Sequence, residues 1–154
     1  MHQKTLKILG FLFNEDRKMD EFIWRGEGNL VRSIRKKQSM LRVIKPYTNP
    51  EQLSIIANAV VNSQILYLAP LWSMTTRANI DKIQVAQTKV ARQILWSRRT
   101  KRQNKPHRQD VINQLSWLNV DQLEKSATIQ IVRKSAMNRS TVKINDMFNF
   151  KVFN

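Results

Sequence analysis

The sequence predicts a mainly α-helical fold, a bundle of four or five helices with a small N-terminal β-hairpin or strand. Three observations support this class. Apolar residues recur at helical spacing in several long segments, proline and N-cap residues mark the ends of those segments, and the N-terminal segment partly alternates in β-branched and aromatic residues. The 154 residues fit one domain or two small ones, and 42% are hydrophobic, enough for a buried core.

The first segment, residues 5–13, is predicted to be a strand or a tight hairpin with Gly10 at its bend. Four acidic residues follow, at Glu15, Asp16, Asp20 and Glu21. Clustered carboxylates can bind Mg²⁺. A favourable interaction with the positive end of a helix dipole accounts better for Asp20 and Glu21, and this is the interpretation we prefer.

A helix is expected over residues 20–43, with Gly26 and Gly28 making its first turns irregular. Its apolar stripe consists of Phe22, Ile23, Leu30, Val31, Ile34, Leu41 and Ile44. The opposite face is predicted to hold five cations, Arg32, Arg35, Lys36, Lys37 and Arg42.

A second helix is expected from Asn49 to about Leu68, since Asn49, Pro50 and Gln52 are typical of a capped helix start and Pro70 ends the segment. Most of its sides are apolar, so we expect its neighbours to cover it as the central helix of the bundle. Its apolar residues are Leu53, Ile55, Ile56, Ala59, Val60, Ile65 and Leu66.

Further helices are predicted after Thr76, around residues 110–115, and from a cap at Asp121 to about Met137. The first of these has an inward stripe at Ile80, Ile83, Ala86, Val90, Ala91 and Ile94. The last has one at Val120, Leu123, Ala127 and Ile131. The C-terminal tail alternates in apolar residues and could form a strand on another surface.

Charge is the strongest functional signal. Lys and Arg total 27 against 11 acidic residues, which gives a net charge of +16 and a pI near 10.9. Such an excess causes self-repulsion unless a polyanion offsets it, and nucleic acid is the commonest partner of so basic a domain. An anionic membrane is the competing partner, but no apolar stretch reaches about 18 residues and no basic amphipathic helix stands out. We therefore expect nucleic acid, with RNA favoured, and no membrane.

The predicted binding residues lie in two places. Residues 97–108 form a basic loop with six cations and no acid, and the stripe on the helix over 20–43 adds weaker candidates. A solvated loop or a nuclear localisation signal is the alternative for the loop, and an ordinary charged helix face for the stripe. Core packing accounts for most tryptophans, with Trp24 and Trp96 as candidates for base stacking. The candidates are Arg98, Arg99, Lys101, Arg102, Lys105, His107, Arg108, Arg32, Arg35, Lys36 and Lys37.

No catalytic, metal or cofactor site is predicted. The chain has no Cys, and its two histidines, His2 and His107, are too few and too far apart for a histidine metal site. No Gly-rich phosphate loop or nucleophile elbow occurs. The lack of Cys and of a readable targeting signal makes us expect an intracellular protein, nuclear or organellar.

Several elements in order resemble the C-terminal part of reverse transcriptases from non-LTR retrotransposons. The primer-grip hairpin with its Leu-Gly pair is similar to residues 7–13, and a helix entry to residues 19–23. The Y-x-x-x-L-W element of the thumb resembles residues 67–72. The element L-x-x-I-Q-x-x-Q-x-x-x-x-R-x-I-L resembles residues 80–95, and L-x-W-L-x-V resembles residues 115–120.

The resemblance covers roughly residues 5–137 and implies a thumb that holds template and primer. It divides the chain into a primer-grip-like element (1–18), a thumb-like bundle (19–96), a basic loop (97–108), and post-thumb helices with a tail (109–154). The metal-binding Tyr-x-Asp-Asp turn and the fingers are absent, so it implies binding of RNA or an RNA–DNA hybrid without polymerase activity. The alternative is a structural RNA-binding subunit of a ribonucleoprotein such as a ribosome, derived from a captured thumb.

Neutralising four cations of the basic loop should flatten the salt dependence of RNA binding. Each phosphate contact contributes about 0.7 to the slope of log affinity against log salt on single strands, so the loss should be about three units. A filter-binding salt titration of the variant with Arg98, Arg99, Lys101 and Arg102 changed to Gln measures it. An unchanged slope would place the binding surface elsewhere.

Overall fold

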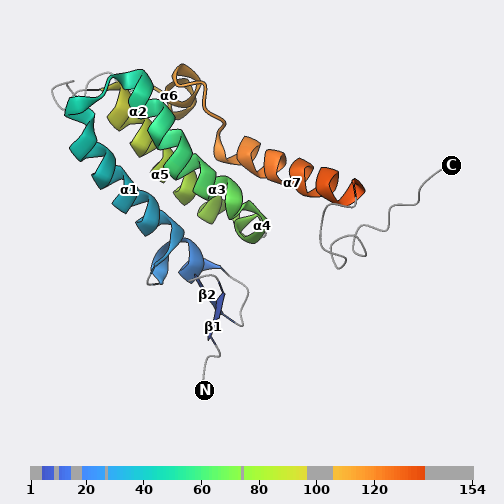
Figure 1. Ribbon diagram of the computed structural model, residues 1–154. Helices are drawn as coiled ribbons and strands as arrows, with labels where there is room; N and C mark the ends of the chain where they lie inside the picture. The colour runs from blue at the N-terminus through green and yellow to red at the C-terminus, as the bar shows by residue number, and fades with distance from the viewer. Residues whose placement is uncertain are drawn as a thin grey trace.

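A computed structural model describes residues 5–8, 11–14, 19–26, 28–73, 75–96 and 106–137. Within these ranges the protein is mainly helical, which confirms the predicted mainly α-helical character (Figure 1). Strands β1 (Thr5–Ile8) and β2 (Phe11–Asn14) pair antiparallel, with Leu6 opposite Phe13. The predicted bend at Gly10 and the C-terminal tail lie outside the described residues.

The first helical segment is split in two by its glycines. A π-helical turn, η1 (Glu21–Arg25), ends at Gly26, and α1 (Leu30–Ile44) starts at a new N-cap, Asn29, whose side chain accepts a hydrogen bond from the Arg32 amide at 2.8 Å. A Cβ atom at Gly26 would lie 2.8 Å from the Glu21 carbonyl oxygen, so this turn needs glycine. The expected irregular entry is confirmed, whereas the α-helix begins at Leu30 rather than near residue 20.

The second predicted helix has the expected capping box at Asn49 and Gln52. After the short 3₁₀ helix η2 (Lys45–Tyr47), it runs through α2 (Pro50–Ala57), the π-turn η3 (Asn58–Asn62) and α3 (Ser63–Tyr67), followed by α4 (Ala69–Trp72).

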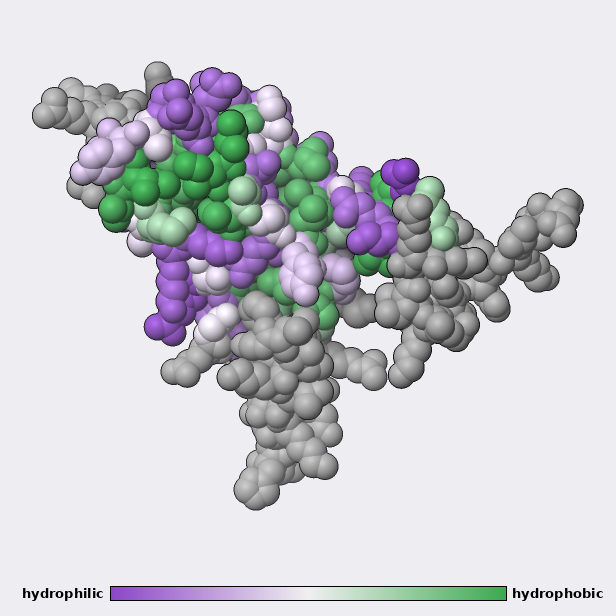
Figure 2. Space-filling model, in the orientation of Figure 1, coloured by the Kyte–Doolittle hydropathy of each residue, from purple (hydrophilic) through white to green (hydrophobic). Residues whose placement is uncertain are grey.

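Its predicted central position is wrong. Ile55 is 65% exposed, and the face of the molecule that carries α2 shows hydrophobic residues to solvent (Figure 2). The buried apolar residues of this helix form one row, which consists of Leu53, Ala57, Val61 and Ile65.

The central helix is instead α5 (Arg77–Leu95), which packs against η1, α1, α2, α6 and α7. Its predicted inward stripe is buried along its whole length, and the small side chains of Ala86 and Ala91 allow neighbouring helices to approach closely. Thr76 occupies the N-cap position without a side-chain hydrogen bond. At the other end, the Lys45 ammonium donates to the backbone carbonyls of Gln93, Ile94 and Trp96, which satisfies the C-terminus of α5.

The chain then returns through α6 (Arg108–Gln114) and α7 (Val120–Ala136). The predicted cap at Asp121 is wrong by two residues. The Asn119 side chain accepts a hydrogen bond from the backbone amide of Gln122, and the Gln122 side chain accepts one from the backbone amide of Asn119. These two bonds form the capping box of α7. The Asp121 carboxylate instead accepts two hydrogen bonds from the Arg77 guanidinium, at 2.7 and 3.0 Å, and so ties α7 to the start of α5.

Replacing Ile83 by Ala should cost about 2–5 kcal/mol in the free energy of unfolding, because Ile83 is fully buried on the central helix and its loss leaves a cavity. Ile55→Ala, on the open side of α2, should stay within about 0.5 kcal/mol of the wild type. Urea melts of the two variants measure both values. Equal effects would mean that α5 is not the centre of the core.

Candidate nucleic-acid interface

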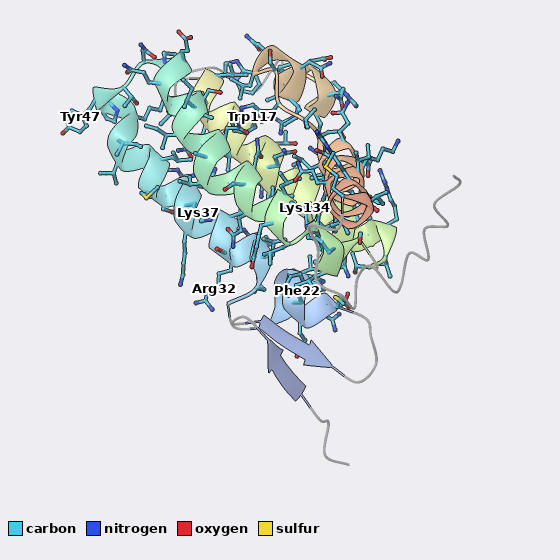
Figure 3. All side chains as sticks on the ribbon, turned by 45° about the vertical axis from the view of Figure 1, so that its right-hand side comes forward. Phe22, Arg32, Lys37, Tyr47, Trp117 and Lys134 are labelled. Atoms are coloured by element: carbon cyan, nitrogen blue, oxygen red, sulfur yellow. The ribbon has the colours of Figure 1, made fainter. Side chains whose placement is uncertain are left out.

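A groove of about 740 Å³ opens between α1 and α5, with η1 and the first residue of α6 also contributing to its walls. Among the residues that the structure describes, five cations and one acid, Asp81, line this groove. The cations are Arg25 from η1, Arg32 and Arg35 from α1, Lys82 from α5 and Arg108 from α6. Figure 3 shows Arg32 projecting away from the helical bundle. The fold therefore concentrates positive charge from four segments of the chain in one concave surface.

These cations remain available for a ligand. Both salt bridges among the described residues involve Arg77, with Asp81 at 3.9 Å and with Asp121 at 2.7 Å. In the part of the chain that the structure describes, no groove cation thus has a salt-bridge partner. Clustered, open cations are the surface that a polyanion binds most favourably.

An aromatic ring lies within this basic surface. Trp24 is 37% exposed, with the Lys82 ammonium 3.7 Å and the Arg25 guanidinium carbon 4.6 Å from its ring centroid. Both distances are within the range of cation–π attraction. The predicted exception of Trp24 from core packing is confirmed, whereas Trp72 and Trp117 are buried and donate their indole N–H groups to Ile65 and Ser54.

A buried amide fixes this end of the groove. Asn79 is almost fully buried and donates to the Asp20 carboxylate at 2.7 Å and to the Thr75 hydroxyl at 2.8 Å, while its oxygen accepts from Lys82 at 3.3 Å. The hydrogen bond from Asn79 lowers the pKa of Asp20, and the nearby charges of Arg25 and Lys82 lower it further. The Asp20 side chain makes no capping bond in its own helix, so it acts by attaching η1 to α5. Glu15 and Asp16 lie outside the described residues.

The predicted placement of Lys37 on the outer face of α1 is wrong. Its ammonium donates to the Val60 carbonyl at 2.5 Å and to Gln64 at 2.6 Å, and burial lowers its pKa. Lys37 therefore links α1 to the neighbouring helix (Figure 3). Arg32 and Arg35 do line the groove, whereas Lys36 is exposed on α1 but does not belong to its lining.

Of the predicted basic loop, the structure describes only the end. Arg98, Arg99, Lys101, Arg102 and Lys105 lie outside the described residues. The ring of His107 accepts from the Gln109 amide at 3.4 Å and caps α6. Arg108 lines the groove, so the two predicted basic segments meet at this surface. Trp96, the other candidate for stacking, is half-buried at the end of α5.

Sequence reasoning missed Arg25, Lys82 and Asn79. Arg25 and Lys82 are isolated cations in their own segments, and only the packing of η1 on α5 brings them together. One local signal could have linked two of these residues: Asn79 and Lys82 are three residues apart, which places them side by side on one helix face.

Comparison with known protein families, with curated proteins and with solved structures finds no significant match to this chain. The resemblance to the thumb of retrotransposon reverse transcriptases therefore stays a prediction. The described residues contain no group of three or more His, Cys, Asp or Glu placed to hold a metal ion. None of the helices in the described ranges is both long and apolar enough to cross a membrane.

Stability should fall at acidic pH in part through Asp20. Its folded-state pKa is lowered below the ordinary 3.8, so its contribution is present above about pH 4 and is lost as the pH falls through the lowered value. Asp20→Asn should thus be less stable than the wild type at pH 7, and the difference should shrink at pH 3 and below. Urea melts across this range measure it. A difference that does not change with pH would exclude Asp20 as the titrating group.

Proposed function

We propose that the groove between α1 and α5 binds the phosphate backbone of a nucleic acid, RNA or an RNA–DNA hybrid in preference to duplex DNA. One observation carries the proposal, the convergence of Arg25, Arg32, Arg35, Lys82 and Arg108 from four chain segments on one open surface. An ordinary solvated helix face explains cations along one helix. It does not explain cations from four segments gathered around a concavity.

The chemistry of these side chains suits phosphate. Four of the five groove cations are arginines, whose planar guanidinium groups form paired hydrogen bonds to phosphate oxygens. Each phosphate neutralised also releases condensed counterions, which supplies most of the affinity of such surfaces. With a net charge of +16, the folded chain gains further from a polyanion because binding relieves self-repulsion.

The resemblance to retroelement thumbs supports RNA or an RNA–DNA hybrid as the ligand. On this proposal the chain is a thumb-like module that holds nucleic acid and catalyses no reaction itself. The two glutamines of the element over residues 80–95, Gln84 and Gln87, take part in a polar network of the core here, as expected of a packing motif. The proposal extends to the basic loop, whose C-terminal end reaches the groove through Arg108.

The alternative, a structural RNA-binding subunit of a ribonucleoprotein, is favoured by a different observation. Several large apolar or aromatic side chains remain exposed near the end of α1, on η2 and on α2, among them Val43, Tyr47 and Ile55. Figure 2 shows hydrophobic residues gathered on this face of the molecule. A protein neighbour in an assembly would cover such side chains. Both alternatives share the groove as the nucleic-acid surface.

Changing Arg32 and Arg35 together to Gln should weaken RNA binding and reduce its salt slope by about 1.4 units on single strands, about 0.7 for each lost phosphate contact. Fluorescence anisotropy of a labelled oligoribonucleotide at several salt concentrations measures both effects.

The matched control is Lys125→Gln with Arg133→Gln, which removes two exposed cations of α7 outside the groove. Its slope should stay close to that of the wild type. If both double variants lost the same affinity and the same salt slope, the loss would come from the lower net charge and not from the groove. An absence of wild-type binding at low salt would refute the proposed function.

A further inference from the structure

Trp24 differs from the buried tryptophans in what surrounds its ring. Trp72 and Trp117 are enclosed by the core, whereas Trp24 follows two buried residues, Phe22 and Ile23, and turns to the surface. Its contacts above the ring are with the cations of Lys82 and Arg25. Trp24 is 37% exposed and lines the basic groove, so part of its indole is open to a ligand there, which points to a role in binding.

The position of the ring is fixed before any ligand arrives. The carboxylate of Asp20 accepts a hydrogen bond from Asn79, and the Trp24 side chain lies close enough to this carboxylate to help lower its pKa. The ammonium of Lys82, also on α5, lies 3.7 Å from the centroid of the Trp24 ring. Because Asn79 is buried on α5, this chain of contacts anchors the indole to the central helix. A pre-positioned ring binds a flat partner without first losing conformational freedom.

We propose that Trp24 is a platform on which an unpaired base stacks while the surrounding cations hold the adjacent phosphates. The groove would then bind single-stranded RNA in preference to duplex RNA. This inference rests on the proposed function and narrows its ligand to single-stranded RNA, because the bases of an RNA–DNA hybrid are paired.

The contacts of Lys82 make the exchange favourable. A cation–π contact at an exposed site is weaker than the stacking of a nucleic-acid base on an aromatic ring. When a base displaces the Lys82 ammonium from the ring, the flexible side chain remains within the groove and can pair with a phosphate instead. The surface thus gives up the Lys82 cation–π contact, and the 3.3 Å hydrogen bond of Lys82 to Asn79, for a stacked base and an ion pair.

Base pairing prevents this mode of binding. In a duplex each base is stacked between its neighbours and its faces are covered, so only unpaired bases can reach an aromatic platform. The phosphates of a duplex would still meet the cations. The expected result is binding of both forms, with the single strand favoured.

The test compares an oligouridylate with an abasic ribose-phosphate oligomer of the same length, so that both carry the same number of phosphates. The wild type should bind the oligouridylate about 5- to 150-fold more tightly, the range expected for one stacked base. Trp24→Ala should remove this preference while leaving affinity for the abasic oligomer and for a duplex RNA nearly unchanged. Anisotropy titrations at one salt concentration give all the affinities.

Two further variants separate stacking from a general loss of structure. Tyr47→Ala removes an aromatic side chain that is 87% exposed and outside the groove, so it should keep the wild-type preference (Figure 3). Trp24→Phe retains an aromatic face and should keep part of the preference, even if Trp24→Ala perturbs the fold.

Equal binding of the two oligomers by the wild type would overturn the stacking inference and leave the proposed function standing. So would a preference that survives in Trp24→Ala. Binding of none of these RNAs would overturn both.

Discussion

The side chain of Gln87 is fully buried where three segments of the chain meet, and its hydrogen bonds hold them in one arrangement. It donates to Asn62 at 3.0 Å and to the Leu118 carbonyl at 2.8 Å, and it accepts from Gln84, whose own oxygen receives the Val120 amide. Each of these groups would cost about 1–3 kcal/mol if buried without a partner. The network therefore fixes the register of α5 against η3 and the start of α7, and with it the groove wall that α5 provides.

The π-turn η3 shows why the local sequence predicted this helix well but misplaced it. Capping residues and prolines act within one turn, so Asn49, Gln52 and Pro70 were readable directly. An α-helix advances about 40° for each step of four residues, so Leu53, Ala57, Val61 and Ile65 would drift off one face. The wider π-turn slows that rotation and keeps the four in line. The spacing of apolar residues predicts neither the π-turn nor which apolar residues a neighbouring helix will cover.

The residues of the candidate site likewise fall into those with a local sequence signal and those brought together only by packing. Arg32, Arg35 and Arg108 could be predicted because each lies in a segment with a local excess of cations. Arg25 and Lys82 could not, since their shared surface exists only after η1 packs on α5. Lys37 was misassigned for the opposite reason. A long ammonium side chain on a helix flank can reach a neighbour's carbonyl, and the choice between solvent and the Val60 carbonyl depends on a helix distant in sequence.

The net charge of a basic protein does not by itself indicate where the protein binds. The cations that bond to groups within the fold must first be set aside. Lys37 and Lys45 satisfy backbone carbonyls and Arg77 pairs with Asp121, so these cations stabilise the fold. In the described part of the chain the groove cations have no salt-bridge partner, although Lys82 donates to Asn79, and like charges gathered in one groove repel one another. If the groove binds a polyanion as proposed, the polyanion would lower that repulsion and bind the folded chain, where the cations are gathered, more tightly than the unfolded chain. On the proposed function, ligand binding and folding are then linked, and nucleic acid should stabilise the helices that form the groove.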